Sequence, residues 1–206
     1  YVNCSGSPIG LVPETKSCQA IVQAWYPGQA GGKAVADVLF GDYNPSGKLP
    51  VTFYKNVEQL PDFEDYDMAG RTYRYFLGEP LYPFGYGLSY TTFTYGDIQL
   101  PETAKEGETI KIVVPVTNKG KMCGDEVVQL YIKKQDDAEG PIKTLRAFKR
   151  VHIPAGETIN VELELTPKQL KWWNPETNTM CHVAGNYDVM VGGNSKDLKV
   201  KTIALQ

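Results

Sequence analysis

The sequence lacks several features that would assign it to a familiar class of protein. No apolar run approaches the ~18 residues that a membrane-spanning helix needs, so we expect no membrane span. Lys and Arg total 21 against 24 Asp and Glu, a net charge of −3, and we expect no nucleic-acid partner because no broad positive surface can form. The chain opens on Tyr1 without a starting Met or a signal sequence, which predicts that it begins within a longer protein.

Cysteine and histidine are also scarce. Four cysteines are too few to build a disulfide scaffold, and no Cys-x-x-Cys or paired Cys and His spacing indicates zinc. With only His152 and His182 available, the sequence predicts no metal site. We expect the thiols to be small buried or half-buried side chains.

The residues that are present describe an ordinary globular chain. Hydrophobic residues make up 42% and charged residues 22% of the 206 positions, enough for two modest cores. The 20 Gly, 14 Pro and 13 Tyr indicate many turns and aromatic-rich surfaces. We expect residues 1–80 to form a first domain, residues 81–92 a linker and residues 93–206 a second domain.

The first 80 residues alternate strand and helix signals, which is typical of an α/β layer. Tyr1–Cys4 is expected to end a buried strand, and Ser5–Pro8 to form the turn at its carboxyl end, where ligands bind in open α/β sheets. From Thr15 onward, apolar residues recur at the i, i+3, i+4 and i+7 positions of a helical face. These residues are Cys18, Ile21, Val22 and Trp25.

A second helix and a strand are expected to follow. The helix begins near Gly31–Gly32 and ends at Gly41. Its inward-directed residues are expected to be Val35, Val38 and Leu39. Asn44–Gly47 then makes a tight turn into a strand at Lys48–Tyr54.

Beyond the linker the period of the apolar residues changes to two. The clearest case alternates Ile159, Val161, Leu163 and Leu165 with Asn160, Glu162 and Glu164. Similar alternation occurs within residues 110–116, 128–132, 187–191 and 198–201. Pro115 predicts an edge strand or a bulge in the first of these runs, because it cannot donate a ladder hydrogen bond. Repeated strands with turns between them predict an antiparallel β-sandwich.

Several motifs carry a family resemblance. In the first half they are Trp25–Gly32 (WYPGQAGG), Asn44–Tyr54 (NPSGKLPVTFY) and Leu81–Phe93 (LYPFGYGLSYTTF). In the second half they are Gly124–Tyr131 (GDEVVQLY), Leu145–Val151 (LRAFKRV) and Gly185–Gly192 (GNYDVMVG). In this order they resemble the C-terminal portion of family 3 glycoside hydrolases. The resemblance implies an α/β segment, part of an α/β sandwich, followed by an all-β immunoglobulin or fibronectin type III-like sandwich.

The resemblance also implies a function for the intact protein. Gly70–Phe76 (GRTYRYF) is more similar to members that act on xylosides than to those that act on glucosides. We therefore expect an exo-acting retaining β-xylosidase with α-L-arabinosidase side activity, and a β-glucosidase is the alternative. The implied partners are an oligosaccharide or glycoside substrate and an upstream catalytic barrel domain, with no cofactor. By the family's habit, the location is periplasmic or extracellular.

Catalysis itself is expected to lie outside this chain. A retaining glycosidase needs two carboxyl groups about 5–5.5 Å apart. In the family, the nucleophile Asp and the acid/base Glu precede the segment that corresponds to Tyr1, so we expect no catalytic residue here. By position, Ser5, Ser7 and Glu14 are candidate substrate-binding residues. The serines lack the Gly-x-Ser-x-Gly setting of a nucleophile, and Glu14 alternatively favours a helix N-terminus.

Other acidic, glycine-rich and aromatic segments have structural explanations. The acids Asp62, Glu64, Asp65 and Asp67 are expected to form a solvated loop or to pair with Arg71 and Arg74, and they lack the glycine of a known calcium loop. Close backbone packing is expected to explain Gly28, Gly31 and Gly32. The aromatic residues of the 82–93 segment are expected to pack between the two domains.

One pair of aromatic residues bears on a rival function. Trp172 and Trp173 are expected to divide, with one buried in the sandwich and the other turned outward. An exposed tryptophan suits a carbohydrate-binding module, which is the second function we consider. A purely structural spacer is the third.

Overall fold

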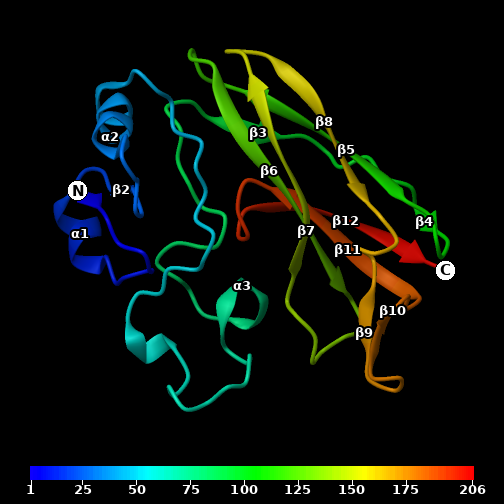
Figure 1. Cartoon of the computed structure of the whole chain (residues 1–206). Helices are drawn as coiled ribbons and strands as arrows, with labels where there is room; N and C mark the ends of the chain where they lie inside the picture. Colours follow the sequence, from blue (N-terminus) through cyan, green and yellow to red (C-terminus); the bar gives the residue numbers. More distant parts are fainter. The chain divides into compact units, whose positions relative to one another are not determined.

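The computed structural model describes all 206 residues and divides into two compact units, Tyr1–Tyr90 and Thr91–Gln206. The first unit contains short helices, two short strands and long irregular segments (Figure 1). Its elements are β1 (Val2–Asn3), α1 (Val12–Ser17), β2 (Val22–Gln23), α2 (Gly31–Phe40), the 3-10 helix η1 (Val57–Gln59) and α3 (Thr72–Tyr75).

The expectation of a helix from Thr15 to Trp25 is wrong. Helix α1 ends at Ser17, and Cys18 already has extended backbone angles of φ −108° and ψ 138°. Val22 lies in β2, which pairs in parallel with β1 and places Val22 beside Val2. A run of four apolar positions is too short to separate one helix from a helical turn followed by a strand, because both satisfy the same spacing.

Helix α2 confirms the second expected helix and its end. Gly41 caps it in the left-handed conformation, with a φ of 85°, which only glycine adopts without strain. Val35 and Val38 are half-buried, as expected of an inward face. The expectation that Leu39 points inward is wrong. The last turn of α2 is uncovered within the chain, and Leu39 and Phe40 are 54% and 84% exposed.

The strand expected at Lys48–Tyr54 is replaced by an extended segment with one isolated bridge, between Phe53 and Tyr82. The N–H groups of Leu49 and Phe53 donate to the carbonyls of Tyr86 (2.8 Å) and Tyr82 (2.9 Å). Pro50 lacks an N–H and interrupts a regular ladder between these points. The first part of the expected linker therefore pairs with the first unit.

Aromatic side chains of the same segment pack on rings of the first unit. Tyr82 stacks on Tyr86 at 5.2 Å between ring centroids and meets Phe53 edge-on at 6.3 Å. Phe84 stacks on Tyr73 at 4.3 Å. These ring contacts lie within Tyr1–Tyr90, and the expected packing of the 82–93 aromatics between the two domains stays a prediction.

The second unit is a β-sandwich, which confirms the expected fold class (Figure 1). One sheet has the strand order β4-β12-β11-β6-β7, the other has the order β3-β5-β8, and a separate hairpin joins β9 to β10. The strands are β3 (Phe93–Tyr95), β4 (Thr103–Ala104), β5 (Ile110–Asn118), β6 (Gly124–Lys134), β7 (Thr144–Ile153), β8 (Thr158–Leu165), β9 (Trp172–Asn174), β10 (Thr179–Cys181), β11 (Gly185–Gly192) and β12 (Leu198–Leu205).

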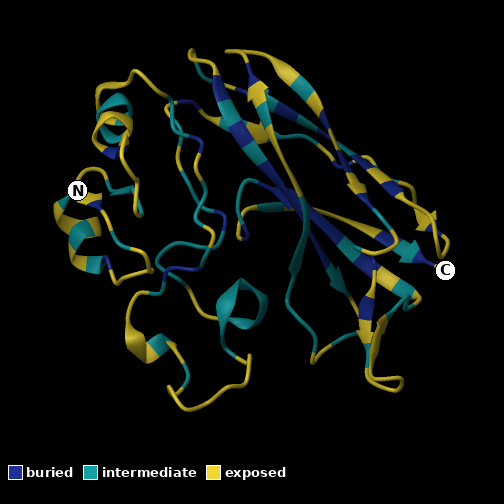
Figure 2. Ribbon diagram, in the orientation of Figure 1, coloured by how far each residue is buried: buried dark blue, intermediate teal, exposed yellow.

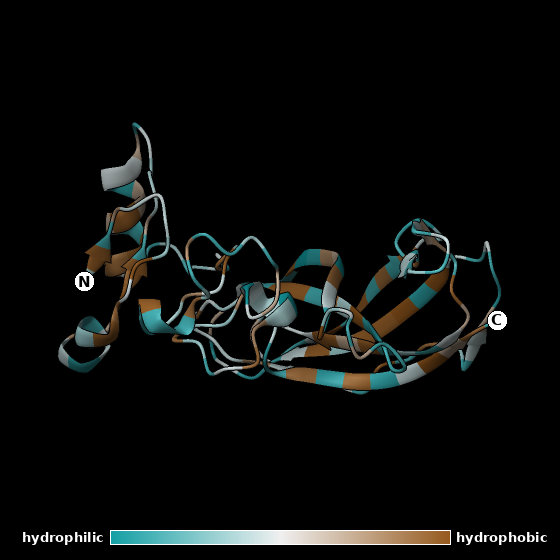
Figure 3. Cartoon of the chain, turned by 90° about the horizontal axis from the view of Figure 1, so that it is seen from below, coloured by the Kyte–Doolittle hydropathy of each residue, from teal (hydrophilic) through white to brown (hydrophobic).

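Alternating side chains build the core of the sandwich. Along β8, Val161, Leu163 and Leu165 are buried while Glu162 and Glu164 are exposed, and Figure 2 shows this alternation. The same period of two is visible as alternating hydropathy along the strands in Figure 3. The two sheets bury these faces against one another, so the hydrophobic core lies between them.

Two details of the strands differ from expectation. Strand β5 is the central strand of its sheet, so Pro115 does not mark an edge. The alternative expectation, a bulge, agrees with the register, because the partner segment from Tyr95 to Gln99 is one residue longer than the stretch from Val113 to Val116. Pro115 is tolerated because pairing with β3 ends opposite Val116 and resumes only at the bridge between Gln99 and Val113. In β12, Val200 is 57% exposed, and the buried residues are instead Ile203 and Leu205.

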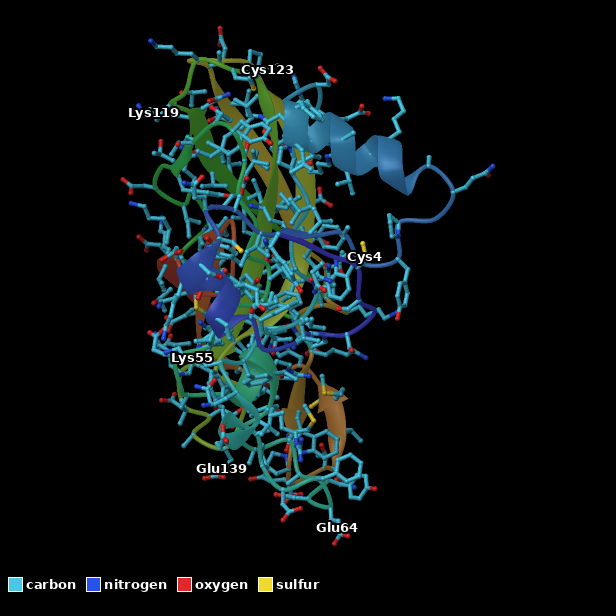
Figure 4. The ribbon with its side chains drawn as sticks, turned by 90° about the vertical axis from the view of Figure 1, so that its left-hand side faces the viewer. Cys4, Lys55, Glu64, Lys119, Cys123 and Glu139 are labelled. Atoms are coloured by element: carbon cyan, nitrogen blue, oxygen red, sulfur yellow. The ribbon has the colours of Figure 1, made fainter.

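The cysteines and helices complete the description. Cys4 and Cys123, which are labelled in Figure 4, are exposed instead of buried as expected. Cys18 and Cys181 are half-buried. None of the four cysteines forms a disulfide. None of the helices has the length and apolar character that a bilayer crossing requires.

Candidate functional site

The candidate site lies where β1 and β2 end. The two strands run in parallel, and the N–H groups of Val22 and Ala24 donate to the carbonyls of Tyr1 (2.8 Å) and Asn3 (2.9 Å). Since both strands point the same way, the chain leaves both of them at one edge of the sheet. The Ser5–Pro8 turn follows β1 at this edge, as the sequence predicts.

A polar network holds this turn. The Asn3 side-chain amide donates to Gln23 Oε1 (2.5 Å) and to Ser5 Oγ (3.2 Å). Gln23 Nε2 donates to the Ser5 carbonyl (3.2 Å), and Ser5 Oγ donates to the Ser7 carbonyl (2.8 Å). Because the Ser5 proton is committed to a carbonyl, Ser5 shapes the turn and is no nucleophile. Sequence reasoning missed Asn3, which is 5% exposed, and Gln23.

The turn also meets the motif at residues 25–32. A Cβ built on Gly6 would lie 2.5 Å from the ring of Tyr26, so only glycine allows the turn to lie against this ring. Tyr26 itself is 79% exposed. The preceding residue, Trp25, has a φ of 54°, a strained conformation for a bulky side chain, and packs edge-on against Phe53. An exposed aromatic ring beside Gly6 of this turn is suited to packing on the apolar face of a sugar.

The glycines of that motif have different roles. A Cβ on Gly31 would lie 2.6 Å from the Pro27 ring, which confirms close packing there. Gly28 is needed for its φ of 70° instead. A Cβ on Gly32 would meet nothing within 4 Å, so the expectation of close packing is wrong at this position.

Glu14 lies in the first turn of α1, as expected. Its Oε2 atom is buried and has no hydrogen-bond partner. The chain itself encloses this oxygen, whereas Glu14 as a residue is half-buried. Glu14 shares no hydrogen bond with the Ser5–Pro8 turn, so the structure does not join all three candidates into one network.

The acidic run is an exposed loop, as expected, with Glu64 at its outer end in Figure 4. Its expected pairing with arginine is wrong in detail. Arg71 donates to backbone carbonyls instead of carboxylates. Its Nε donates to the carbonyl of Asp67 (3.0 Å), and one terminal nitrogen donates to the carbonyls of Asp62 (3.0 Å) and Asp65 (2.5 Å). The carboxylates of Asp62 and Asp65 instead accept backbone N–H groups two residues onward, and the Asp62 carbonyl also accepts the Asp65 N–H (3.1 Å). No group of three or more His, Cys, Asp or Glu has the arrangement that a metal ion needs.

The tryptophan pair of the second unit divides as predicted. Trp172 is 3% exposed, and its Nε1 donates to Asp137 Oδ2 (2.5 Å). The Arg146 guanidinium carbon lies 5.4 Å from the Trp172 ring centroid, and Tyr187 meets this ring edge-on at 5.7 Å. Trp173 is 49% exposed on the β9–β10 hairpin, opposite Met180. Trp172 therefore anchors the hairpin that displays Trp173.

The chain is thus an α/β segment followed by a β-sandwich, with a polar turn at the carboxyl ends of two parallel strands. Residues 1–90 match the sequence profile described as the Glycosyl hydrolase family 3 C-terminal domain, and residues 126–195 match that of the Fibronectin type III-like domain. The chain belongs to glycoside hydrolase family 3.

Relatives in this family include xylosidases and glucosidases. The chain is 59% identical over 207 residues to a xylan 1,4-beta-xylosidase of Xylanibacter ruminicola, covering 100% of this chain and 24% of the relative. It is 39% identical to a periplasmic beta-glucosidase of Salmonella typhimurium, covering 95% and 27%. The structure of a beta-glucosidase from Kluyveromyces marxianus matches with a TM-score of 0.88 and 36% identity, covering 100% and 26%. The chain thus spans about a quarter of the length of the curated relatives that it matches.

Proposed function

We propose that this chain is the C-terminal, non-catalytic portion of an exo-acting retaining β-xylosidase, which is called the parent protein below. The observation that carries this proposal is the full-length similarity of the chain to a quarter of a xylan 1,4-beta-xylosidase, at 59% identity. The identity to the periplasmic beta-glucosidase is lower, at 39%, which favours xylosides over glucosides. The domains we propose are residues 1–80, a linker at 81–92 and residues 93–206.

In the parent protein, the nucleophile Asp and the acid/base Glu come from the upstream barrel and its neighbouring domain. The Ser5–Pro8 turn and Tyr26 face the sugar. The Ser7 hydroxyl donates a hydrogen bond to a sugar hydroxyl or accepts one from it, and the Glu14 carboxylate accepts one. The exposed position of Ser7 at the carboxyl ends of β1 and β2 supports this role. Loss of one such hydrogen bond corresponds to about 0.5–1.5 kcal/mol, or roughly a twofold to tenfold change in affinity.

Steady-state kinetics of the parent protein test the proposal. Nitrophenyl β-D-xyloside should be hydrolysed with a higher kcat/KM than the β-D-glucoside, with the α-L-arabinoside as a slower second substrate. Ser7→Ala and Glu14→Gln should raise KM, while Ser17→Ala, which removes an exposed hydroxyl of α1, should not. A preference for the glucoside would refute the xylosidase assignment and favour the alternative, a β-glucosidase.

The parent protein is proposed to work in the periplasm or outside the cell. The name of the Salmonella relative, a periplasmic beta-glucosidase, supports this location. Cell fractionation with an antibody against the sandwich tests it, and recovery in the cytoplasmic fraction would contradict it.

One observation favours carbohydrate binding as a second function of the sandwich. Trp173 is half exposed on a hairpin that Trp172 holds in place. A pull-down of the chain on insoluble xylan should lose binding with Trp173→Ala and keep it with Phe148→Ala, a matched control at another exposed ring of the same unit. Equal binding by both variants would refute this function.

A further inference from the structure

Two side-chain amides lie at the inner end of the Ser5–Pro8 turn. Asn3 and Gln23 are partners in the register of β1 and β2, and each is the last residue of its strand. Asn3 is 5% exposed, whereas the next residue, Cys4, is exposed at the surface (Figure 4). The chain therefore passes from the interior to the surface within one residue, and the two amides mark where the turn begins.

The hydrogen bonds of these amides run in one direction, from the interior toward Ser7. The Asn3 amide donates to Gln23 Oε1 (2.5 Å) and to Ser5 Oγ (3.2 Å). Gln23 Nε2 donates to the Ser5 carbonyl (3.2 Å). Ser5 Oγ then donates its own hydrogen to the Ser7 carbonyl (2.8 Å). A continuous series of donors thus joins a buried amide to the backbone of Ser7.

This network holds the backbone of Ser7 and leaves its side chain for a ligand. Ser7 is exposed, and its carbonyl, not its hydroxyl, ends the network. Because its backbone is already held, the Ser7 hydroxyl loses less freedom on binding a sugar than it would on a mobile turn. The amides can therefore affect sugar binding without contacting the sugar.

We propose that Asn3, Gln23 and Ser5 are positioning residues of the sugar site in the parent protein. They do not touch the sugar, and they hold Ser7 where its hydroxyl meets it. This inference rests on the proposed function, in which Ser7 contacts the substrate. Its chemistry requires amides at positions 3 and 23, because a carboxylate has no hydrogen to donate. Asn3→Asp removes the donor to Gln23 and Ser5, and Gln23→Glu removes the donor to the Ser5 carbonyl.

Steady-state kinetics of the parent protein on nitrophenyl β-D-xyloside test the inference. Asn3→Asp, Gln23→Glu and Ser5→Ala should each raise KM by roughly twofold to tenfold, since the contact at stake is one hydrogen bond of Ser7, and should leave kcat within about twofold. Ser5→Thr, which keeps a hydroxyl, should restore the original KM. In a protein that already carries Ser7→Ala, none of the three changes should raise KM further, because they act only through Ser7.

The matched control is Gln129→Glu, the same change from amide to carboxylate at a buried site of the second unit. Gln129 is 3% exposed, and its Nε2 donates to the Gly193 carbonyl (2.6 Å). This variant should lower the melting temperature and leave KM unchanged, which separates lost stability from lost positioning. Thermal unfolding of every variant is measured alongside the kinetics. Ser5→Ala keeps the test decisive if a strand variant fails to fold, because Ser5 lies on the turn.

The outcomes distinguish this inference from the proposed function. A KM that rises with Ser7→Ala but not with the Asn3 and Gln23 variants would overturn the inference and leave the contact of Ser7 intact. A rise that persists when Ser7→Ala is already present, or an equal rise with Gln129→Glu, would also overturn it. An unchanged KM for Ser7→Ala would contradict the proposed contact itself, and this inference with it.

Discussion

Replacing each of the two adjacent tryptophans should lower the stability of the sandwich by very different amounts. Trp172 is 3% exposed and makes three contacts: a hydrogen bond from Nε1 to Asp137, a cation–π contact with Arg146 and an edge-on contact with Tyr187. Truncation of a buried tryptophan to alanine typically costs about 3–5 kcal/mol. Because Trp172→Ala also leaves Asp137 without its donor, we expect a loss of free energy of unfolding of about 4–5 kcal/mol.

Trp173→Ala removes a ring that is 49% exposed and whose cross-strand neighbour is Met180. Such a cross-strand pair contributes about 0.2–1 kcal/mol, so the expected loss is below about 1 kcal/mol. Trp172→Phe should fall between the two variants, because it keeps most of the buried ring and loses only the hydrogen bond, at about 1–3 kcal/mol.

Urea unfolding followed by circular dichroism of the strands measures all three variants. With a slope of about 2 kcal/mol per molar urea, Trp172→Ala should lower the midpoint by about 2 M and Trp173→Ala by less than about 0.5 M. Equal losses from the two alanine variants would refute the assignment of Trp172 as the anchor of the β9–β10 hairpin.

Three further predictions concern packing and pH. Gly87→Ala should destabilise the first unit by about 1–3 kcal/mol, because the added Cβ would collide with the carbonyl oxygen of Gly47. Gly32→Ala should be neutral or stabilising by up to about 1 kcal/mol, because nothing lies within 4 Å of its Cβ position. Thermal unfolding of both variants checks this. The hydrogen bond from His152, and then Arg150, lowers the pKa of Asp125, so its contribution to stability is present above about pH 4 and is lost as the pH falls further; Asp125→Asn should flatten an acid titration of stability. Burial raises the pKa of Tyr187 to about 12, so the stability that comes from its neutral side chain is fully present below about pH 10 and is lost between pH 10 and 12. Tyr187→Phe should remove this loss of stability when unfolding is measured across an alkaline pH series.

The sandwich could be predicted from the sequence because its signal is local and repeated. Along β8 every second residue is apolar, and a half-buried strand requires that pattern, so the buried face follows directly from Val161, Leu163 and Leu165. Val200 alternates with lysines in the same way, yet it is exposed, because alternation alone does not determine which face is buried: the buried residues Ile203 and Leu205 lie on the opposite face of β12.

The first unit was harder to predict because long-range contacts shape its short elements. Val22 belongs to a two-residue strand that exists only because β1 lies beside it, and no local period encodes that pairing. The Ser5–Pro8 turn was placed correctly after β1, but the amides of Asn3 and Gln23 that hold it are 20 residues apart in the chain. Glu14 was found from its place in α1, whereas its enclosed carboxylate oxygen is visible only in the structure.

The most direct test of the account is whether this chain alone can break a glycosidic bond. We predict that residues 1–206 do not hydrolyse nitrophenyl β-D-xyloside, while the parent protein does and loses the activity when its upstream nucleophile Asp is replaced. Turnover by the isolated chain at an enzymatic rate, abolished by a substitution within residues 1–206, would contradict the proposal that the catalytic carboxyl groups lie outside it.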